Sequence, residues 1–502
     1  MPSSPRRLSL LFSGLLILFA ISGAPQVASA APPRGGGSDA GTDGGTGTDG
    51  GTTCKKCPPD AGTDAGTPDA GSDAGTDAGT PDAGSDAGTP DAGSGTDAGT
   101  PDAGSGTDAG TPPTTSCLAG PVLRSLGKDH MMVGAQAEPA VAGQAPFDIR
   151  YMYLAGGLFD STETCTSCLS CTAAGQSCSS SNPNGCGWHG CWQWDQLAPG
   201  QHLRDFLSQT ANLGQLPMIT YYEILHTSRV AEGAEEVASV QNVSMMQRYF
   251  NDWRFVLKQI GNTTVLLHLE PDFWGFAQKV NSNPHLIPAA VASANPTDCA
   301  NQENSVAGMG RCMISMVRKY APNARVGLQA SSWASSTDSM LNVSLLVNVE
   351  EEARKVADFL LECGGGQGDY VAVEAADRDA QWYQLTQGRN RWWDATNVTL
   401  PNFKQAFRWV KALSERMGKP NLWWQLPVGN MNLLGVDKQW KDNRLDYFFN
   451  HPQEVAAAHG MGMVFGAGEL AQTNPSTDNA HLVNRTNAYF FNGGQSVCTS
   501  TP

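Results

Sequence analysis

Two carboxylic acids, Glu270 and Asp272, stand on either side of Pro271 at the end of an apolar run that begins at Thr264. The run has the β-branched and leucine-rich composition of a buried strand. Proline cannot donate a hydrogen bond to a neighbouring strand, so the strand should end there and the chain should turn outward. In an α/β barrel, chemistry is done by side chains that follow the strands. A carboxyl group at this place can donate or accept a proton.

Other predicted strands also end in acidic residues. Cleavage of a glycosidic bond needs one carboxylic acid to protonate the leaving oxygen and a second carboxylate as base or nucleophile. Asp272 is the predicted proton donor, and Glu270 beside it would tune its pKa. A water-sized gap to the second carboxylate would give inversion, and a close approach would give retention. The candidates for that second group are Asp377, Asp379, Glu374 and Glu469.

Each of these acids also has a purely structural alternative. The alternation of side chains along a strand places Glu270 on the same face as His268. There it could form a buried ion pair with Arg150 inside the barrel. Arg378 could make a loop-capping salt bridge with the aspartates on either side of it. The other two glutamates could be held by internal hydrogen bonds.

Aromatic side chains cluster near the same strand ends. An aromatic ring offers a flat apolar face to a pyranose ring, but aromatic residues are often simply core. In the adjacent pairs 392–393 and 423–424, one tryptophan should therefore be buried. The predicted substrate-binding residues are Tyr151, Tyr222, Trp274, Trp333, Trp382, Trp393, Trp424 and Gln425.

Strand-like runs alternate with helical patterns, which is typical of a parallel sheet covered by helices. The predicted strands are 148–154, 218–224, 265–270, 325–330, 370–375, 422–426 and 462–465. The predicted helices lie near 201–213, 237–260, 302–321, 350–363, 400–418 and 446–459. The pattern predicts an α/β fold, a TIM-like (β/α) barrel. It is either closed by an eighth strand in the cysteine-rich insertion or the tail, or distorted and open with seven strands.

The first part of the chain does not look like part of this barrel. Residues 1–30 have the charged start, apolar stretch and Ala-Ser-Ala ending of a signal peptide, and a membrane anchor would need a longer apolar run. Residues 31–116 repeat Asp, Ala, Gly, Thr and Pro, and they cannot bury enough apolar surface to fold. This linker carries about −11 of the net charge of −16, so the acidity says little about partners. Residues 117–502 are the predicted catalytic domain.

These features predict an exported protein, secreted or at the cell surface. A nucleic-acid partner is not expected, because the chain has no basic patch. No membrane span is expected, and we expect a monomer whose partner is a polysaccharide.

The thirteen cysteines of an exported chain predict disulfides. Six of them fall in a cysteine-rich insertion at 161–195, where the start Cys-x-x-Cys-x-x-Cys also resembles a zinc knuckle. We favour a disulfide-stapled loop there, with fifteen pairings open. Elsewhere Cys299 could pair with Cys312 and Cys117 with Cys498, which would leave Cys363 over. No metal and no cofactor are expected.

Part of the chain resembles a known family. Glu270-Pro271-Asp272 after an apolar strand is similar to the Glu-Pro-Asp of glycoside hydrolase family six, the inverting cellobiohydrolases and endoglucanases. Cys299-Ala-Asn, Cys312 and the stretch from Tyr320 to Trp333 follow in that family's order, and 466–469 loosely resembles its late Gly-Gly-Glu. The resemblance is strongest over 264–333. It implies that Asp272 is the general acid, that Trp333 is a subsite platform and that the barrel is distorted with seven strands.

The chain also departs from the family pattern. The aspartate that assists the acid is missing after Tyr222, Gln329 replaces a second aspartate, and Ala471 a third. A different base, Asp377 or Asp379, would have to serve.

We therefore expect a secreted, cellulase-like glycoside hydrolase that cleaves a β-linked polysaccharide by acid/base catalysis with inversion. One alternative is a non-catalytic carbohydrate-binding or surface protein on the same barrel. The other is a retaining barrel glycosidase that uses Glu270 with Glu374 or Glu469.

Overall fold

The computed structural model describes residues 117–155, 158, 172–173, 176–177, 200–468 and 471–497. The predicted signal peptide and linker, most of the cysteine-rich insertion, Glu469 and Cys498 lie outside the described residues. No helix in the described part of the chain is long and apolar enough to cross a bilayer.

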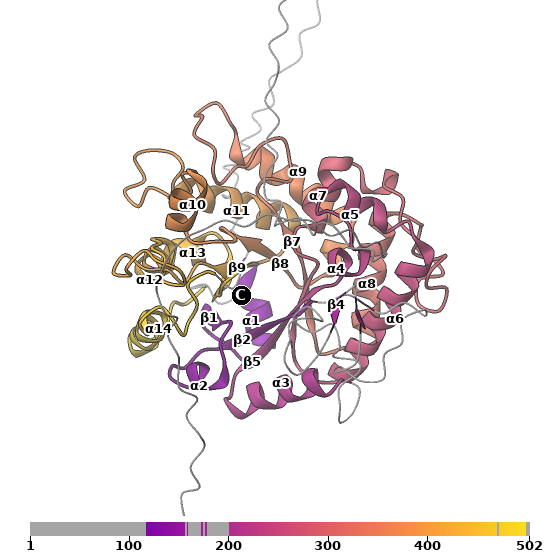
Figure 1. The fold of residues 1–502 in the computed structure, drawn as a ribbon, viewed down its shortest axis with the longest axis horizontal. Coiled ribbons are helices and arrows are strands. Elements are labelled where there is room, and N and C mark those ends of the chain that lie inside the picture. The colour runs from indigo at the N-terminus through magenta and orange to yellow at the C-terminus, as the bar shows by residue number, and fades with distance from the viewer. Residues whose placement is uncertain are drawn as a thin grey trace, which may run out of the picture. The chain divides into compact units, whose positions relative to one another are not determined.

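Eight parallel strands close into a barrel in the order β1-β10-β9-β8-β7-β6-β5-β2 (Figure 1). They are β1 (Met132–Ala135), β2 (Ile149–Ala155), β5 (Leu216–Tyr222), β6 (Leu266–Leu269), β7 (Arg325–Ala330), β8 (Tyr370–Glu374), β9 (Asn421–Leu426) and β10 (Gly460–Phe465). Each pairs with the next strand of the barrel along the chain, and β1 pairs with β10 to close the ring. The TIM-like barrel is thus confirmed. The remaining described strands, β3 (Thr172–Ala173) and β4 (Gln176–Ser177), form a separate antiparallel pair.

The expectation of an open barrel with seven strands is wrong, and so is the place expected for an eighth. The missing strand is β1, which precedes the first predicted strand instead of lying in the insertion or the tail. It has four residues, Met-Val-Gly-Ala, and all four are buried. So short a run shows no alternation, and two of its residues are poor strand formers, so the pattern did not reveal it.

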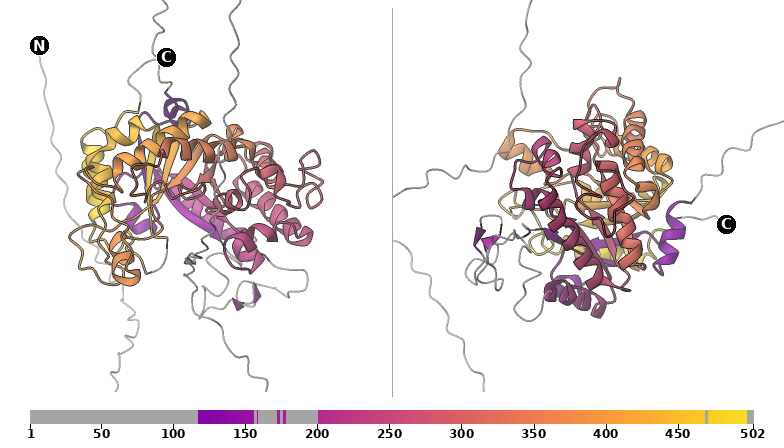
Figure 2. Two further views of the ribbon diagram at one scale, coloured as in Figure 1. Left: turned by 90° about the horizontal axis from the view of Figure 1, so that it is seen from above. Right: turned by 90° about the vertical axis from the view of Figure 1, so that its right-hand side faces the viewer.

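Helices surround the strands, as the two views of Figure 2 show. Along the chain they are α1 (Ala119–Ser125), α2 (Pro139–Ala142), α3 (Gln201–Asn212), α4 (Ile224–Ser228), α5 (Ala234–Ser239), α6 (Val243–Ile260), α7 (Phe273–Val280), α8 (Val306–Tyr320), α9 (Val349–Glu362), α10 (Ala380–Gln387), α11 (Phe403–Met417), α12 (Arg444–Asn450), α13 (Pro452–Ala457) and α14 (His481–Phe491). Four of the long helices begin at a polar residue whose side chain accepts a backbone N–H of the first turn, which satisfies an otherwise unpaired donor. These N-caps are Asn242, Ser305, Asn348 and Asn402.

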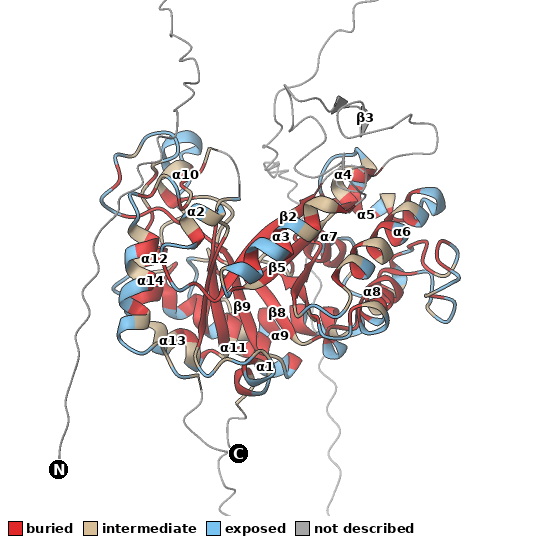
Figure 3. Cartoon of the chain, turned by 90° about the horizontal axis from the view of Figure 1, so that it is seen from below, coloured by how far each residue is buried: buried red, intermediate tan, exposed pale blue. Residues whose placement is uncertain are grey.

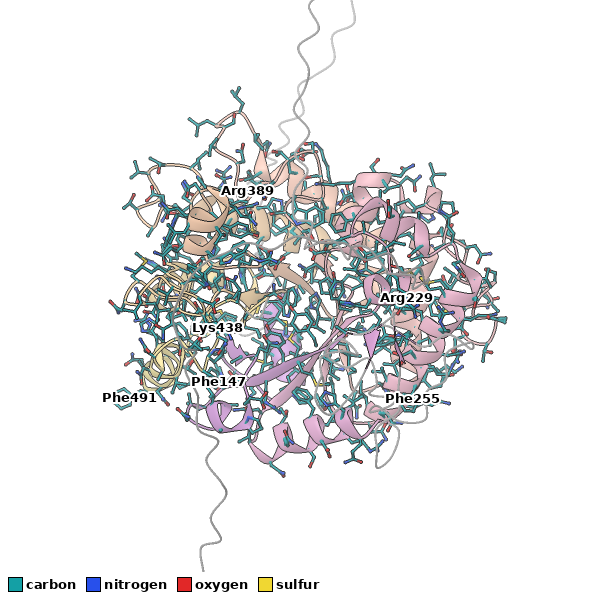
Figure 4. The ribbon with its side chains drawn as sticks, viewed as in Figure 1. Phe147, Arg229, Phe255, Arg389, Lys438 and Phe491 are labelled. Atoms are coloured by element: carbon teal, nitrogen blue, oxygen red, sulfur yellow. A yellow bond between two sulfur atoms is a disulfide. The ribbon has the colours of Figure 1, made fainter. Side chains whose placement is uncertain are left out.

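Burial divides the barrel strands into two faces. One set of side chains, including Leu266, Tyr370 and Trp424, fills the inside of the barrel, and the alternate set packs against the surrounding helices. Figure 3 shows the strands buried and the exposed residues on the outer helices and loops. In Figure 4 the side chain of Phe491, the last residue of α14, lies at the outer edge and is 91% exposed.

Helix α1 covers the amino-terminal ends of the strands. Its residues Ala119 and Leu123 belong to the cluster inside the barrel, together with Met132 and Ile149 from the starts of β1 and β2. Figure 3 shows α1 at the opposite end of the strands from α4 and α10, which follow the carboxyl ends of β5 and β8. The carboxyl ends are therefore the place to look for a site.

The predicted disulfide between Cys299 and Cys312 is present, with a Cα–Cα distance of 5.5 Å. Cys117 is also in a disulfide, but its expected partner, Cys498, lies outside the described residues. Cys363 is buried and is a free thiol, as expected for the cysteine left over.

Candidate active site

Asp272 lies on the turn from β6 to α7, at the carboxyl end of the barrel. Both Glu270 (φ 44°) and Asp272 (φ 67°) have a positive φ, a backbone conformation that residues other than glycine rarely adopt. Such conformations persist where the surroundings over-determine them. Here the indole N–H of Trp274 donates to the carbonyl of Leu269 (3.0 Å), and the N–H of Glu270 donates to the carbonyl of Tyr221 (2.8 Å). The turn thus fixes where Asp272 lies.

Four acidic residues, which we name the carboxylate cluster, interact electrostatically around this turn: Glu232, Asp272, Glu374 and Asp377. Burial, then the negative charges of Glu232 and Asp377, raise the pKa of Asp272 to about 7. Burial, then Asp272 and Asp377, raise the pKa of Glu374 well above its ordinary value. Close carboxylates do not all ionise together, so the cluster retains protons near neutral pH. A general acid needs such a proton.

Glu374 is held in place by a chain of hydrogen bonds from two other strands. Gln425, at the end of β9, is 5% exposed, and its Nε2 donates to Oε1 of Glu374 at 2.8 Å. The hydroxyl of Tyr153, on β2, donates to Oε1 of Gln425. The amide therefore joins β2, β8 and β9 and leaves little freedom to the Glu374 carboxyl group.

Asp377 lies just beyond β8, and its side chain is 43% exposed. It accepts a hydrogen bond from the hydroxyl of Tyr383 and pairs with Arg378. The predicted loop salt bridge is thus present, yet it leaves the carboxylate at the surface. The guanidinium of Arg378 lies 5.0 Å from the ring centroid of Trp382, which is half-buried. Trp382 thus lies beside the arginine that pairs with Asp377.

Glu232 was not predicted as a site residue. It lies in the turn before α5, and Tyr222 hydrogen-bonds to it. Burial and the charge of Asp377 raise its pKa. No strand leads directly into Glu232, so neither alternation nor a motif marks it in the sequence. The tyrosine, which does end a strand, was the only available signal.

Asp379, a candidate for the second carboxylate, lies outside the carboxylate cluster. Its side chain is 1% exposed; Oδ1 accepts the N–H of Gly429 and Oδ2 accepts the N–H of Thr473, both at 3.0 Å. The carboxyl group thereby ties together the loops that follow β8, β9 and β10. Both oxygens of Asp379 therefore accept a backbone N–H.

Glu270 also faces away from the cluster. Its positive φ ends the alternation of β6, so it does not share the inward face of His268 as expected. The side chain is 0% exposed and contacts Tyr249 on α6, outside the barrel. The alternative ion pair does not form either, because Arg150 donates to the carbonyl of Ala137 and to Thr210.

Most of the predicted sugar platforms are core residues. The exposed fractions are 1% for Trp274, 1% for Trp393 and 2% for Trp424, and Tyr151 is also buried at 2%. Large aromatic side chains gain most by burial, and this overrides their position after a strand. Trp333 is half-buried, but Lys279 already lies over its ring at 4.8 Å, and it packs on Phe276. Of the predicted binding residues, the structure brings Tyr222, Trp382 and Gln425 to the carboxylate cluster.

Within the described part of the chain, no group of three or more histidine, cysteine, aspartate or glutamate residues is arranged to hold a metal ion. The carboxyl groups of the cluster can donate protons to a bound molecule and accept protons from it.

No protein-family model matches this chain, and no curated protein matches it. The resemblance to glycoside hydrolase family six is therefore not confirmed and stays a prediction.

Several solved glycoside hydrolase structures are similar in part. An endo-β-1,4-mannanase of family 26 from Cellulomonas fimi has a TM-score of 0.35 and 9% identity, over 74% of this chain and 78% of that chain. A β-1,4-mannanase of family 113 has a TM-score of 0.36 and 10% identity, over 72% and 98%. Endo-glycoceramidase II from Rhodococcus sp. has a TM-score of 0.35 and 9% identity, over 71% and 78%. Similarities of this size do not assign the chain to any of those families.

Proposed function

We propose that this chain is an exported glycoside hydrolase that cleaves a β-linked polysaccharide. The observation that carries the proposal is the carboxylate cluster at the carboxyl end of a closed α/β barrel, with an acid whose pKa is raised to about 7. The first thirty residues, which read as a signal peptide, support export.

In this proposal Asp272 is the general acid that protonates the leaving oxygen. Asp377 is the base that activates water, because its side chain is 43% exposed and is oriented by Tyr383 and Arg378. Glu374, fixed by Gln425, is a protonated neighbour, because burial, then the charges of Asp272 and Asp377, raise its pKa well above its ordinary value. The charges that favour the protonated form of Asp272 are those of Glu232 and Asp377. Attack by a water molecule from the side opposite the leaving group would invert the anomeric centre. The retaining alternative that used Glu270 as nucleophile loses support, because Glu270 is buried behind the turn.

The test is hydrolysis of plant, fungal and bacterial cell-wall glycans by the full-length chain, by Asp272→Asn and by a control, Asp205→Asn. Asp205 is an exposed residue on α3 whose carboxylate accepts a hydrogen bond from Gln201. Loss of a general acid costs about 10²–10⁴-fold in rate, so Asp272→Asn should release reducing ends at least that much more slowly than the other two proteins.

Two outcomes would contradict the proposal. Equal turnover by Asp272→Asn would remove Asp272 from the chemistry. Glycan binding without turnover by all three proteins would favour the non-catalytic carbohydrate-binding alternative. Where turnover is found, the anomeric form of the first product, followed by NMR, decides between inversion and retention.

A further inference from the structure

Glu270 is fully buried, yet among the described residues no lysine, arginine or histidine pairs with it. Instead its carboxyl group accepts three hydrogen bonds. Oε1 accepts the N–H of Glu223 at 3.2 Å and the hydroxyl of Tyr249 at 2.8 Å, and Oε2 accepts the N–H of Ile224 at 3.4 Å. Removing a carboxyl group from water costs free energy, and here no opposite charge compensates for it. The three hydrogen bonds that Glu270 accepts therefore need a structural or functional explanation.

These contacts join three elements at one point. Glu223 lies between β5 and α4, Ile224 is the first residue of α4, and Tyr249 lies in the middle of α6. The main chain of Glu270 is held by the same strand end, because its N–H donates to the carbonyl of Tyr221 at 2.8 Å. Both the backbone and the side chain of this single residue therefore fasten the end of β6 to the end of β5.

Two groups of the proposed site lie next to these contacts. Glu270 hydrogen-bonds to the carbonyl of Tyr221 and to the N–H of Glu223, and Tyr222 lies between them. Tyr222 in turn hydrogen-bonds to Glu232 of the carboxylate cluster. Asp272 is two residues after Glu270, and both have a positive φ. Strained backbone of this kind persists only while neighbouring contacts hold it.

We infer that Glu270 is a positioning residue, whose carboxyl group and its partner Tyr249 fix the placement of Asp272 and Tyr222 without contacting the substrate. The catalytic consequence of this inference depends on the proposed function, but the placement itself does not. If the hydrogen bonds of Glu270 are lost, Asp272 should be displaced, and its electrostatic interaction with Glu232 should change.

The structure offers a matched pair of variants for the test. Tyr249→Phe removes only the hydroxyl that donates to Glu270. Tyr221→Phe removes an equally buried hydroxyl, which donates to Asp252 at 2.7 Å and not to Glu270. Glu270→Gln, which keeps the shape but changes the acceptors, is the third variant. Thermal unfolding of each full-length variant identifies any variant that does not fold. If Glu270→Gln does not fold, the comparison of Tyr249→Phe with Tyr221→Phe tests the inference.

The first readout is kinetic. Tyr249→Phe and Glu270→Gln should lower kcat by about ten- to a hundredfold with little change in KM, since a small displacement of a catalytic group has effects of this order. They should also move the basic limb of the pH profile, and Tyr221→Phe should do neither. A purely structural role would lower the melting temperature and leave both the profile and kcat unchanged.

The second readout does not need turnover. Carbon-13 NMR of the aspartate carboxyl groups follows the titration of Asp272, assigned by its loss in Asp272→Asn. The inference expects the Asp272 midpoint to move in Tyr249→Phe and to stay in Tyr221→Phe. An unmoved midpoint in folded Tyr249→Phe, or an equal shift in both tyrosine variants, would overturn it. A shift as expected in a protein that hydrolyses no glycan would overturn the proposed function and leave the positioning role standing.

Discussion

The proposed function depends most on Asp272, whose pKa is raised by neighbouring charges as well as by burial. Its pKa is raised to about 7 first by burial and then by Glu232 and Asp377. The protonated form is the active one for a proton donor, so activity should fall as pH rises through about 7. Because neighbouring charges contribute to the raised value, removing one of them should lower it.

We therefore predict that Glu232→Gln moves the basic limb of the pH–rate profile to lower pH, by a fraction of a pH unit to about one unit. The reason is that an uncharged neighbour no longer disfavours ionisation of Asp272. The measurement is kcat against pH between 5 and 9, with Asp205→Asn as the control whose profile should match that of the unaltered chain. An unchanged limb in Glu232→Gln would mean that the charge of Glu232 does not contribute to the pKa of the acid.

At this scale the sequence predicted Asp272 as the acid but did not predict the residues around it. Asp377 and Asp379 are two residues apart and chemically identical, and nothing in the sequence separates them. Only the path of the loops decides that one is at the surface and the other is enclosed by backbone N–H groups. The positive φ of Glu270 could not be predicted from the sequence either, and because of it the side chain lies on the outer side of the barrel.

Among the elements, the loops after β8, β9 and β10 depend on a single buried carboxyl group. Asp379 accepts the N–H of Gly429 and of Thr473, and burial, then the charge of Asp442, raise its pKa to about 7. A buried donor left without an acceptor costs about 1–3 kcal/mol.

Asp379→Ala leaves two donors without an acceptor, so we predict a loss of about 2–5 kcal/mol in the free energy of unfolding. Urea denaturation, with Asp437→Ala as the control at an exposed position of the loop after β9, measures this loss. A loss of less than about 0.5 kcal/mol, which is usual for a surface substitution, would show that water or other groups replace the carboxyl group. If Asp379 were instead the catalytic base, its replacement would abolish turnover without this loss of stability.

Element by element, the sequence predicted the long, regular parts best. The strand at Arg325–Ala330 was predicted with its observed bounds. The predicted helix at 237–260 covers all of α6 and the last residues of α5, and Asn242, the N-cap of α6, lies between the two helices. Strong periodicity and caps are local signals, so they can be read from the chain. Strand β1 has no such local signal. It is a strand because it pairs with both β10 and β2 and so closes the barrel.

For the molecule as a whole, the side of the barrel at β5 and β6 concentrates buried acids. Glu236 on α5, Asp252 on α6 and Glu270 have exposed fractions of 0%, 1% and 0%. Burial, with Glu270 and Glu232 as the next causes, raises the pKa of Glu236 to about 8; burial also raises the pKa of Glu270 to about 8 and of Asp252 to about 7. The ordinary values are 4.5 for glutamate and 3.8 for aspartate.

The sign of the effect on stability follows from proton binding. Between these ordinary values and the raised ones, the folded state holds protons that the unfolded state has released. The contribution of these groups to stability is therefore fully present below about pH 4 and is lost as pH rises through 7 to 8. For each group the free energy of unfolding falls by about 1.4 kcal/mol per pH unit within its window.

We predict that Glu236→Gln makes the free energy of unfolding fall less steeply with pH, so that the variant is more stable than the unaltered chain at pH 9 and gains less at pH 5. Glutamine keeps the size of the side chain and cannot ionise, so burying it costs the same at every pH. Urea denaturation at pH 5, 7 and 9 gives the slopes, and Glu235→Gln, at an exposed neighbouring position on the same helix, is the control. If both variants kept the slope of the unaltered chain, Glu236 would ionise freely in the folded protein, and this side of the barrel would be open to water.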